Sequence, residues 1–471
     1  MQLQKIKKSF NIILFGASGD LAKLKLFPAL FELAWQKRFI QNYRIFGFAR
    51  TPLTQAAFKK MVMESIQTKF KTADQKSLNA FLDHLHYFKG QYDSPKDFKS
   101  LSQALLKAET FAYFGVPPIA FKPIIAQLAE LKKRGKQDIK LILEKPLGED
   151  EKSATEIFHF VSQFFEEDHI FLLDHYLGKT PVQSILPLRT TNTILNVLLQ
   201  GQHISNIQVS ALEDVGVGER VGYFEAVGIL KDMIQSHLLQ ILALITMAIP
   251  LSQTSKAIRR EKMHILSALR YGPKGCAIVL GQYKNYQKEK GVKRGSKTAT
   301  FAALRCFIDL LDWLNVPIYL RTGKRLHHKY TYIVVEFKKP ILYHQNKSIS
   351  ANKLIIELAP EEKIQIRLVD PTGKTVAARR ELISTESLTC TGDDCLSEHG
   401  RLILETMLGD HTHFVSFEEI LASWRFVDRV VKRIEKDKIT PILYNDGSEG
   451  PADQHKLTTC DKVHWYDADA L

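Results

Sequence analysis

The sequence predicts an α/β domain followed by an α+β domain, and three observations support this fold class. Over the first 175 residues, short apolar runs alternate with longer amphipathic stretches, which is typical of a Rossmann-type, doubly wound parallel sheet. Beyond that point, several strand-like runs follow one another with short turns, which favours a large, mainly antiparallel sheet packed against helices. The length of 471 residues exceeds one ordinary core. We therefore expect a first domain over 1–175 and a second over 176–471.

The N-terminal elements alternate in type. The apolar run NIILF, at 11–15, is expected to form a strand and 21–36 a helix, before a second strand at 43–50. A helix is expected over 54–70, because apolar residues recur there at helical spacing. The remaining elements continue this βαβ rhythm: a strand at 86–90, a helix near 95–108, a strand at 111–118 that ends in Pro-Pro, a helix at 119–134 and a strand at 139–146.

The second domain contains a long apolar helix, expected over about 226–248. The longest apolar stretch, 238–250, has 13 residues, which are too few to span a membrane. Strands are then expected at 276–283, 330–337, 353–360 and 363–369. We therefore predict no membrane association for this chain.

The net charge and the composition limit the kinds of molecule that this chain is expected to bind. The chain carries a formal net charge of +14 and is 45% hydrophobic and 25% charged, as soluble globular proteins are. Such a charge suits either a nucleic-acid-binding protein or an enzyme that acts on anionic small molecules. Basic clusters such as 131–136 and 258–262 lack interleaved aromatic residues, so we favour the enzyme and expect no nucleic acid.

The five cysteines show no zinc-ligand pattern; they lie at positions 276, 306, 390, 395 and 460. We therefore predict free thiols in a reducing compartment and no metal site. The apolar run near the N-terminus is too short for the core of a signal peptide. Together these features indicate a cytoplasmic protein.

A glycine-containing loop follows the first predicted strand, in FGASGDLAKLK at 15–25. Gly16, Gly19 and Ala22 are spaced three apart between a strand and a helix, which is the context of a dinucleotide-binding loop. Gly16 would make the tight turn, Gly19 would admit a diphosphate, and Ala22 would let the helix lie close to the sheet. The helix N-terminus would add partial positive charge. The alternative is an ordinary βα turn.

The end of the second predicted strand distinguishes NADP from NAD. NAD enzymes carry an acidic residue there for the ribose hydroxyls, whereas this strand ends in Arg50, with no acid beside it. An arginine suits a 2′-phosphate, and Ser18 and Lys25 would add a hydroxyl donor and a charge. These residues therefore favour NADP; the alternative is that Arg50 is an ordinary surface arginine.

Two further groups of polar residues are candidates for ligand binding or catalysis. LLDHYLGK, at 172–179, begins at a strand end and holds an acid, an imidazole, a phenol and an ammonium, a set that suits a phosphate. Asp232 and His237 lie in the otherwise apolar helix, where each buried polar group needs a partner. In an α-helix their side chains would point about 140° apart. A lone histidine there is more often a core residue with its hydrogen bonds made than a catalytic base. The pattern alone therefore does not identify a reaction.

Nearly end to end, the sequence resembles the glucose-6-phosphate dehydrogenase family. The resemblance rests on DHYLGK at 174–179, which is highly specific, and on these further segments: GASGDLAKLK at 16–25, EKPLG at 144–148, GYFEAVGILKDMIQSHLLQ at 222–240, RGSKTATFAA at 294–303, VPIYLRTGK at 316–324 and RLILETMLGDHTHFV at 401–415. It implies oxidation of glucose 6-phosphate at C1 to 6-phosphogluconolactone with hydride transfer to NADP, in the oxidative pentose phosphate pathway. The alternatives are a Rossmann dehydrogenase of another sugar or sugar phosphate, and a weakly active NADP-binding regulatory homologue.

The resemblance also implies a role for each site residue. His237 would remove the proton of the C1 hydroxyl, and Asp174 would hydrogen-bond the imidazole and stabilise the imidazolium. Pro146 would set the angle of Lys145 between cofactor and sugar, since an X-Pro bond can be cis. The substrate would be bound by Lys145, His175, Tyr176, Lys179, Glu213, Asp232, Lys324 and Lys329. The cofactor would be bound by Gly16, Ala17, Ser18, Gly19, Asp20, Leu21, Lys25, Arg50, Gln91, Tyr92 and Lys145.

The resemblance further implies that 1–175 binds the dinucleotide, and that 176–471 binds the substrate and forms a homodimer or homotetramer through its sheet. It implies no metal. Three positions depart from the family pattern: Leu172 replaces an arginine, Lys329 stands where an arginine is common, and Ser236 replaces an asparagine. These departures bear on affinity and rate rather than on the reaction type.

Overall fold

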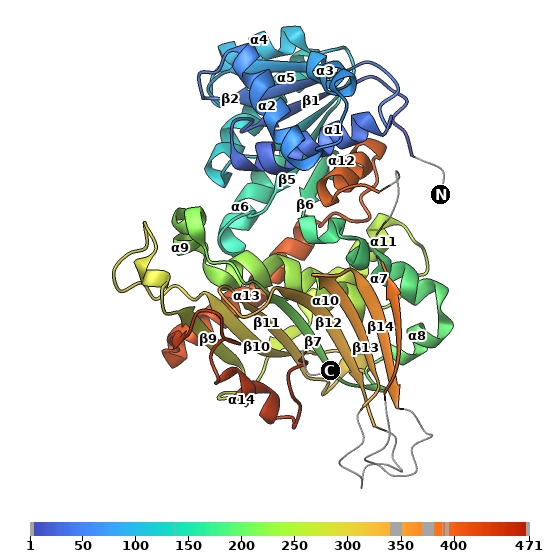
Figure 1. The fold of residues 1–471 in the computed structure, drawn as a ribbon, viewed down its shortest axis with the longest axis vertical. Coiled ribbons are helices and arrows are strands. Elements are labelled where there is room, and N and C mark those ends of the chain that lie inside the picture. The colour runs from blue at the N-terminus through green and yellow to red at the C-terminus, as the bar shows by residue number, and fades with distance from the viewer. Residues whose placement is uncertain are drawn as a thin grey trace. The chain divides into compact units, whose positions relative to one another are not determined.

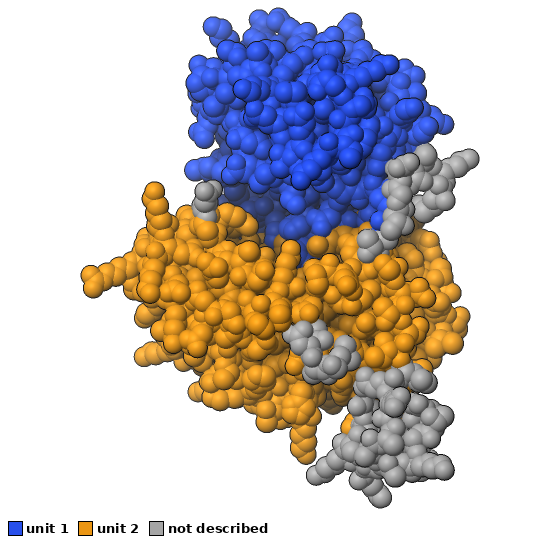
Figure 2. All heavy atoms as spheres, in the orientation of Figure 1, with its two compact units in different colours: residues 1–178, 390–417 blue, residues 179–389, 418–471 orange. Residues whose placement is uncertain are grey.

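The computed structural model describes residues 4–135, 137–339, 351–369, 381–388, 390 and 395–467. The chain divides into two compact units, shown in blue and orange in Figure 2. Unit 1 comprises 1–178 and 390–417, and unit 2 comprises 179–389 and 418–471. The first boundary lies close to the expected one at residue 175, but 390–417, expected in the second domain, lies in unit 1.

Unit 1 is built on a parallel sheet in the order β3-β2-β1-β4-β5-β6; strands β1, β2, β5 and β6 are labelled in Figure 1. Every neighbouring pair of these strands is parallel, as the alternating sequence pattern predicts. The order reverses between β1 and β4, and sheets of this kind bind ligands at the carboxyl ends of such strands. The strands are β1 (Phe10–Phe15), β2 (Tyr43–Ala49), β3 (Leu85–Lys89), β4 (Glu109–Phe114), β5 (Ile139–Glu144) and β6 (Ile170–Leu173).

Helices connect these strands, and several begin at a side-chain cap. Thr54, Asp74, Ser94 and Asp150 each accept a hydrogen bond from the backbone N–H three residues later, which satisfies a donor at the helix start. The first helix contains a π-helical segment, η1 (Ala22–Leu26), near its start. The α-helices are α1 (Phe27–Trp35), α2 (Gln55–Lys69), α3 (Gln75–Asp83), α4 (Pro95–Ala104), α5 (Phe121–Gly135) and α6 (Glu151–Ser162).

A late segment of the chain joins unit 1 through α12 (Glu398–Leu408). Its Leu402 and Ile403 are buried in the same apolar cluster as Leu30 of α1. The backbone N–H of Ser397, the cap of α12, donates to Glu32 Oε2 at 2.9 Å. The sequence does not reveal this placement, because an amphipathic helix shows which face is buried but not which element covers it.

Unit 2 contains a ten-stranded sheet in the order β15-β14-β13-β12-β7-β11-β10-β9-β16, with β8 paired to β10. Most neighbours are antiparallel, as predicted, but β7 pairs with β11, and β9 with β16, in parallel. The strands are β7 (Ile204–Leu212), β8 (Leu269–Tyr271), β9 (Ile278–Tyr283), β10 (Phe301–Ile308), β11 (Ile318–Gly323), β12 (Tyr330–Phe337), β13 (Lys353–Ala359), β14 (Lys363–Val369), β15 (Glu381–Ser387) and β16 (Ile442–Tyr444).

The long apolar helix of unit 2 is three segments rather than one. α9 (Val221–Ile229) contains a residue with non-helical backbone, Gly228, at φ 66° and ψ 169°. A π-helical segment, η6 (Leu230–Leu238), follows, and α10 (Leu239–Thr246) completes the run. By length and composition this run could cross a membrane, but 78% of its most apolar window is buried in the protein, as in a core helix. The other helices are α7 (Thr180–Thr191), α8 (Thr193–Leu198), α11 (Ser255–Ser267), α13 (Phe417–Asp437) and α14 (Gln454–Thr459).

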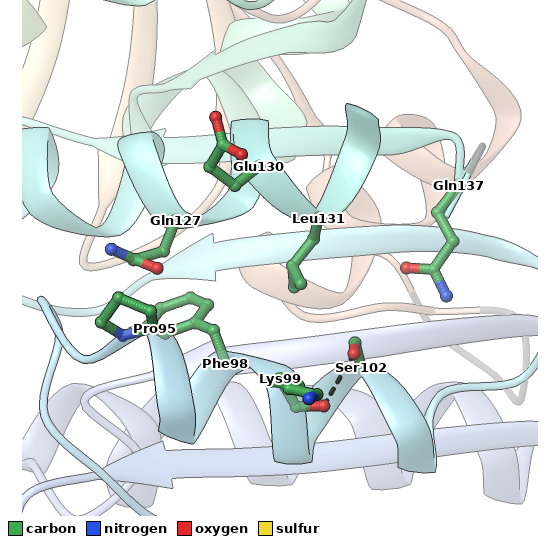
Figure 3. A pocket seen from close by; sticks show the side chains of 8 residues that line it. All are labelled: Pro95, Phe98, Lys99, Ser102, Gln127, Glu130, Leu131 and Gln137. Atoms are coloured by element: carbon green, nitrogen blue, oxygen red, sulfur yellow. Dashed lines mark hydrogen bonds between the residues drawn. The ribbon is translucent and has the colours of Figure 1, made fainter. Parts of the chain in front are cut away.

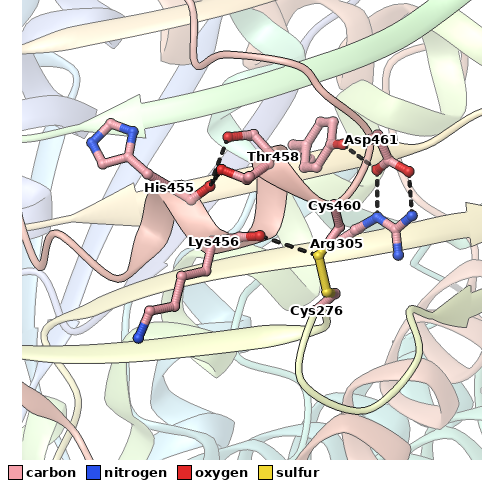
Figure 4. Close-up of a disulfide and its surroundings, with 9 residues drawn as sticks. Cys276, Arg305, His455, Lys456, Thr458, Cys460 and Asp461 are labelled. Atoms are coloured by element: carbon pink, nitrogen blue, oxygen red, sulfur yellow. Dashed lines mark hydrogen bonds and ion pairs between the residues drawn. A yellow bond between two sulfur atoms is a disulfide. The ribbon is translucent and has the colours of Figure 1, made fainter.

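Two disulfides contradict the prediction of free thiols. Cys276 is bonded to Cys460 in unit 2 (Figure 4), and Cys390 is bonded to Cys395 in unit 1. Cys306 keeps a free thiol and is buried. The first pair is separated by 184 residues, so the sequence spacing carried no sign of it. The thiol argument for a reducing compartment therefore fails.

Candidate active site

The glycine loop lies at the carboxyl end of β1, beside the loop that follows β4. Gly16 has a φ of +81°, and a Cβ there would lie 2.1 Å from the carbonyl oxygen of Gly115. The N–H of Gly16 donates to Phe48 O at 2.9 Å, and the N–H of Gly19 donates to Gly16 O at 2.9 Å. Only glycine fits the conformation and the space at position 16, so this residue makes the tight turn.

A helix begins directly after this turn, at Asp20. Ala22 is 1% exposed, so the start of the helix lies against the sheet, and Ala17 is also buried. The first N–H groups of a helix have no acceptor within it, which suits this end to a diphosphate. The other loop residues are exposed or partly exposed: Ser18, Gly19, Leu21 and Lys25.

Four of the predicted cofactor residues, Ser18, Arg50, Gln91 and Tyr92, lie beyond the ends of β1, β2 and β3. The Arg50 guanidinium carbon is 5.6 Å from the centre of the Tyr92 ring, and Gln91 beside this ring is exposed. Ser18 Oγ forms a 2.8 Å hydrogen bond with Thr51 Oγ1. Burial raises the pKa of Tyr92, and the charge of Arg50 partly offsets this shift. Thr51 adds a hydroxyl that the motifs did not single out, although its place directly after Arg50 was the available signal.

The end of β5 holds the next predicted residue. Glu144 is the last residue of β5, and it is followed by Lys145 and a cis peptide bond to Pro146. Glu144 accepts a hydrogen bond from the Tyr113 hydroxyl, and His399 Nε2 of α12 lies 3.7 Å from Glu144 Oε1. Neither Glu144 nor His399 was predicted. No motif marks His399, because only the packing of α12 brings it to this strand end.

Asp174 directly follows β6 and precedes a 3₁₀ turn, η4 (His175–Gly178). Asp174 is 2% exposed, and its Oδ1 accepts a hydrogen bond from the N–H of Tyr176 at 3.0 Å. The His175 ring lies 6.3 Å from the ring of His399. The turn therefore orients the Asp174 carboxylate through its own backbone, and His399 of α12 adds a second imidazole near that of His175.

Unit 2 carries the second group of predicted residues. Lys179 is the residue that caps the N-terminus of α7. Asp232 and His237 lie on η6 and are 5% and 2% exposed, and Arg220 Nη2 is 3.9 Å from Asp232 Oδ1. The expected angle between Asp232 and His237 assumed an α-helix and was wrong. A π-helix bonds residue i to i+5, so residues five apart lie nearer to one face.

The parallel pairing of β7 with β11 brings Glu213 and Lys324 together. Leu212 is in register with Gly323, so the next residue of each strand emerges at the same edge of the sheet. Lys324 is 6% exposed, and its Nζ forms an ion pair with Glu213 Oε2. Lys329 is exposed directly before β12, the neighbour of β7 on its other side.

The three departures from the family pattern occupy different environments. Leu172 is 2% exposed in β6, and its carbonyl accepts the N–H of Val415 at 3.1 Å. Ser236 is partly buried on η6, next to His237, and Lys329 is exposed. Leu172 is therefore a core residue, whereas the side chains of Ser236 and Lys329 retain access to solvent.

Each unit thus assembles part of the predicted site. Unit 1 gathers the glycine loop, Ser18, Arg50 and Tyr92 at one edge of its sheet. Unit 2 pairs Glu213 with Lys324 and places His237 on η6. Asp174 belongs to unit 1 and His237 to unit 2, so their pairing stays a prediction.

Unit 1 also holds a cavity of about 380 Å³ between α4 and α5 (Figure 3). Phe98 and Leu131 form its apolar part, and Lys99 and Glu130 are its charged residues. None of the residues predicted to bind the cofactor lines this cavity. We therefore do not assign the nucleotide here.

Comparisons with known sequences match both units. Residues 13–184 match the family model described as glucose-6-phosphate dehydrogenase, NAD binding domain, and 186–466 match the C-terminal domain. Glucose-6-phosphate 1-dehydrogenase 5, cytoplasmic, of Arabidopsis thaliana is 34% identical, covering 95% of this chain and 90% of its own length. The chloroplastic dehydrogenase 3 of the same plant is also 34% identical, covering 97% of this chain and 80% of its own.

Solved structures show the same similarity. A glucose-6-phosphate dehydrogenase in complex with its substrate glucose 6-phosphate matches with a TM-score of 0.88 and 29% identity, covering 99% of this chain and 100% of that one. Glucose-6-phosphate 1-dehydrogenase from Mycobacterium avium matches with a TM-score of 0.85 and 27% identity, covering 98% and 99%. The similarity therefore includes both units and is not confined to the nucleotide-binding sheet.

Proposed function

The chain belongs to the glucose-6-phosphate dehydrogenase family, and from this premise we infer that it oxidises glucose 6-phosphate at C1 with NADP. The product is 6-phosphogluconolactone, and the reaction is the first step of the oxidative pentose phosphate pathway. The observation that carries this conclusion is the match of both family domains, over 13–184 and 186–466, to consecutive parts of one chain. Within each of the two domains, a specific role in binding or catalysis is assigned to the residues described above.

NADP, when bound, supplies the acceptor of the hydride. The ends of β1 and β2 fit this cofactor, because the Gly16 turn leaves no room for a side chain and Arg50 stands where NAD enzymes carry an acid. We assign the diphosphate to the loop from Gly16 to Leu21, with Lys25 as a nearby charge. The 2′-phosphate is assigned to the Arg50 guanidinium and to the paired hydroxyls of Ser18 and Thr51. Gln91 and Tyr92 border this site.

His237 is the proposed general base. It is 2% exposed on η6, so little water reaches its ring before substrate binds. It accepts the proton of the C1 hydroxyl while the hydride leaves C1, and the electron pair of the broken O–H bond forms the carbonyl of the lactone. Asp174 is proposed to accept a hydrogen bond from the imidazole, which would select the tautomer and stabilise the imidazolium.

The sugar phosphate is assigned to the segment that joins the two units. Lys179 supplies charge for the phosphate, and His175 and Tyr176 supply hydrogen bonds. Further contacts to the sugar are assigned to Lys145 at the end of β5 and to these residues of unit 2: Glu213, Asp232, Lys324 and Lys329. The Glu213–Lys324 ion pair supports this assignment, since it holds an acceptor and a donor at one sheet edge before the sugar arrives.

The substrate is tested by following NADPH absorbance with glucose 6-phosphate, free glucose and other hexose phosphates. We expect the highest kcat/KM for glucose 6-phosphate, because the proposed site combines a phosphate lysine with acceptors for sugar hydroxyls. Preference for another sugar or sugar phosphate would establish the sibling dehydrogenase instead. Absence of turnover by folded protein that binds NADP would establish a regulatory homologue.

We also propose that unit 2 forms a homodimer or homotetramer through its sheet. Leu368 of β14 and Ile383 of β15 are 46% and 45% exposed, and these two strands lie at one edge of the sheet. Exposed apolar side chains on neighbouring strands suit contact with a second copy of the chain. Light scattering that gives the mass of one chain at micromolar concentration would contradict this proposal.

A cytoplasmic location is proposed as well. The cytoplasmic Arabidopsis relative supports it, while the chloroplastic relative shows that similar proteins occupy more than one compartment. Detection of the native protein in a soluble cytoplasmic fraction would agree, and its recovery from an organelle fraction would not.

A further inference from the structure

A cavity of about 1110 Å³ lies in unit 2, at the C-terminal ends of α7 and α10. Arg189 of α7 and Thr246 of α10 line it, as does Trp313, which lies just before β11. None of the residues assigned above to substrate or cofactor lines this cavity. Its place in the molecule therefore sets it apart from the proposed catalytic site.

Arg189 is the unusual residue of this cavity. It is 4% exposed, and its guanidinium donates one hydrogen bond to protein, from Nη1 to Leu244 O at 3.0 Å. Its Nε is buried and has no hydrogen-bond partner among the described residues. Two acids, Glu261 and Asp312, also line the cavity, yet neither forms an ion pair with Arg189 in the part of the chain that the structure describes.

A buried guanidinium without a carboxylate is costly. Burial lowers the pKa of Arg189 to about 10, so the group remains charged at neutral pH. Leu244 belongs to the last turn of α10, where unsatisfied carbonyls and the helix dipole stabilise a cation only in part. The rest of the free-energy cost of desolvating this charge must be offset by a counter-charge or by water.

The geometry of the guanidinium indicates what kind of group would supply that charge. Nε–H and the neighbouring Nη2–H form one edge of the planar fork, and the hydrogen bond to Leu244 O uses the opposite nitrogen, Nη1. This edge is the one that binds a carboxylate or phosphate through two parallel hydrogen bonds. Leu199, Met247 and Trp313 are buried and line the same cavity.

We propose that this cavity binds a small organic anion, whose carboxylate or phosphate is bound by the Arg189 guanidinium while its apolar part packs against Trp313. The site is separate from the proposed sugar-phosphate site. Lys179 immediately precedes α7, and Arg189 lies ten residues further along the chain within that helix, which corresponds to about 15 Å at 1.5 Å per residue.

Trp313 gives a direct readout of binding. Tryptophan fluorescence of the full chain is titrated with inorganic phosphate and, separately, with cyclohexanecarboxylate, with sodium chloride holding the ionic strength constant. We expect a saturable change in the wild type that disappears in Trp313→Phe. Tighter binding of cyclohexanecarboxylate would identify a carboxylate with an apolar body as the ligand class, and tighter binding of phosphate would identify a phosphate.

Two variants separate this site from its alternatives. Arg189→Gln should weaken binding of the anion about tenfold or more, because it removes the charged hydrogen-bond donor. Lys179→Ala, which alters the proposed sugar-phosphate site, should leave the Trp313 response unchanged. If Arg189→Gln does not fold, Arg189→Lys keeps the charge but not the fork and should still weaken binding several-fold.

The proposal is overturned if neither anion produces a saturable Trp313 response in the wild type. It is also overturned if the response is as strong in a folded Arg189 variant, or if it is lost in Lys179→Ala. Arg189 would then serve only as a cap for the C-terminal end of α10.

Discussion

The two units prepare their parts of the site by different physical means. Unit 1 uses backbone shape: the Gly16 turn, at φ +81°, and the ends of adjacent parallel strands leave N–H groups and one arginine exposed. Unit 2 uses paired charge: at the predicted site Lys324 pairs with Glu213. Outside that site, Lys262 of α11 lies 2.8 Å from Glu419 of α13, with side chains 1% and 0% exposed. Substitutions in unit 1 should therefore act mainly through steric fit, and those in unit 2 through uncompensated charge.

The largest expected effect is on catalysis in unit 2. His237→Asn should lower kcat by about 10²–10⁴-fold, because the asparagine cannot accept the C1 hydroxyl proton. NADP affinity should stay unchanged, since the residues assigned to the cofactor lie in unit 1. NADPH absorbance gives kcat, and fluorescence titration gives cofactor affinity. Ser236→Ala, its partly buried neighbour, is the matched control, and full kcat in His237→Asn would exclude His237 as the base.

The buried ion pair of unit 2 tests the role of charge in stability. Lys262→Met leaves the Glu419 carboxylate buried without its cation and also removes the 3.1 Å hydrogen bond from Lys262 Nζ to Gln240 Oε1. We expect a loss of about 3–5 kcal/mol in the free energy of unfolding, measured by denaturant titration. The double variant Lys262→Met/Glu419→Leu should recover most of that loss. Equal destabilisation of both variants would mean that packing, not charge, decides the effect.

Substitution in the glycine turn tests whether steric fit dominates in unit 1. Gly16→Ala places a Cβ 2.1 Å from Gly115 O at a positive φ, so the backbone must move. The strained φ alone should cost about 1–3 kcal/mol of stability, and NADP binding should weaken with it. Gly19→Ala is the matched control for stability, because its Cβ would lie 3.2 Å from Gly16 O and its φ is not positive. Equal destabilisation of the two variants in thermal unfolding would contradict an effect of backbone strain at Gly16.

The smallest expected effect concerns cofactor choice. Arg50→Gln should raise the KM for NADP about tenfold or more and leave the KM for NAD unchanged, because only NADP carries the 2′-phosphate. Lys25→Gln is the comparison, since a lysine near the diphosphate should affect both cofactors alike. Steady-state kinetics with each cofactor measures this difference. A parallel rise of both KM values in Arg50→Gln would assign the arginine to the diphosphate instead.

Much of unit 1 could be predicted because its signals are local. The apolar run before Gly16, the small-residue spacing and Arg50 all fall within the first two strands and the helix between them. The requirement for glycine follows from a single φ angle, and the absence of an acid beside Arg50 is visible directly in the sequence. Thr51 was overlooked only because no motif assigns it a role.

Unit 2 was harder to predict because its geometry depends on distant partners. The apolar pattern of 226–248 was correctly expected to be helical, but it does not distinguish an α-helix from the π-helical η6 that carries Asp232 and His237. Likewise, Glu213 and Lys324 are 111 residues apart, and nothing in either strand states that β7 and β11 run parallel. The sequence around Arg189 carries no sign of its environment, because burial without a counter-charge depends on residues that are distant in the chain.

By itself, the sequence determined the alternation of strands and helices, the glycine turn and the arginine that follows β2, since each depends on residues close together in the chain. Only the tertiary structure decided that α12 packs on α1, that Glu213 meets Lys324, and that Cys276 meets Cys460. Those contacts join residues far apart in sequence. Their pairing is decided by the burial of apolar surface over a whole unit and by the need of buried polar groups for partners, which no local pattern records.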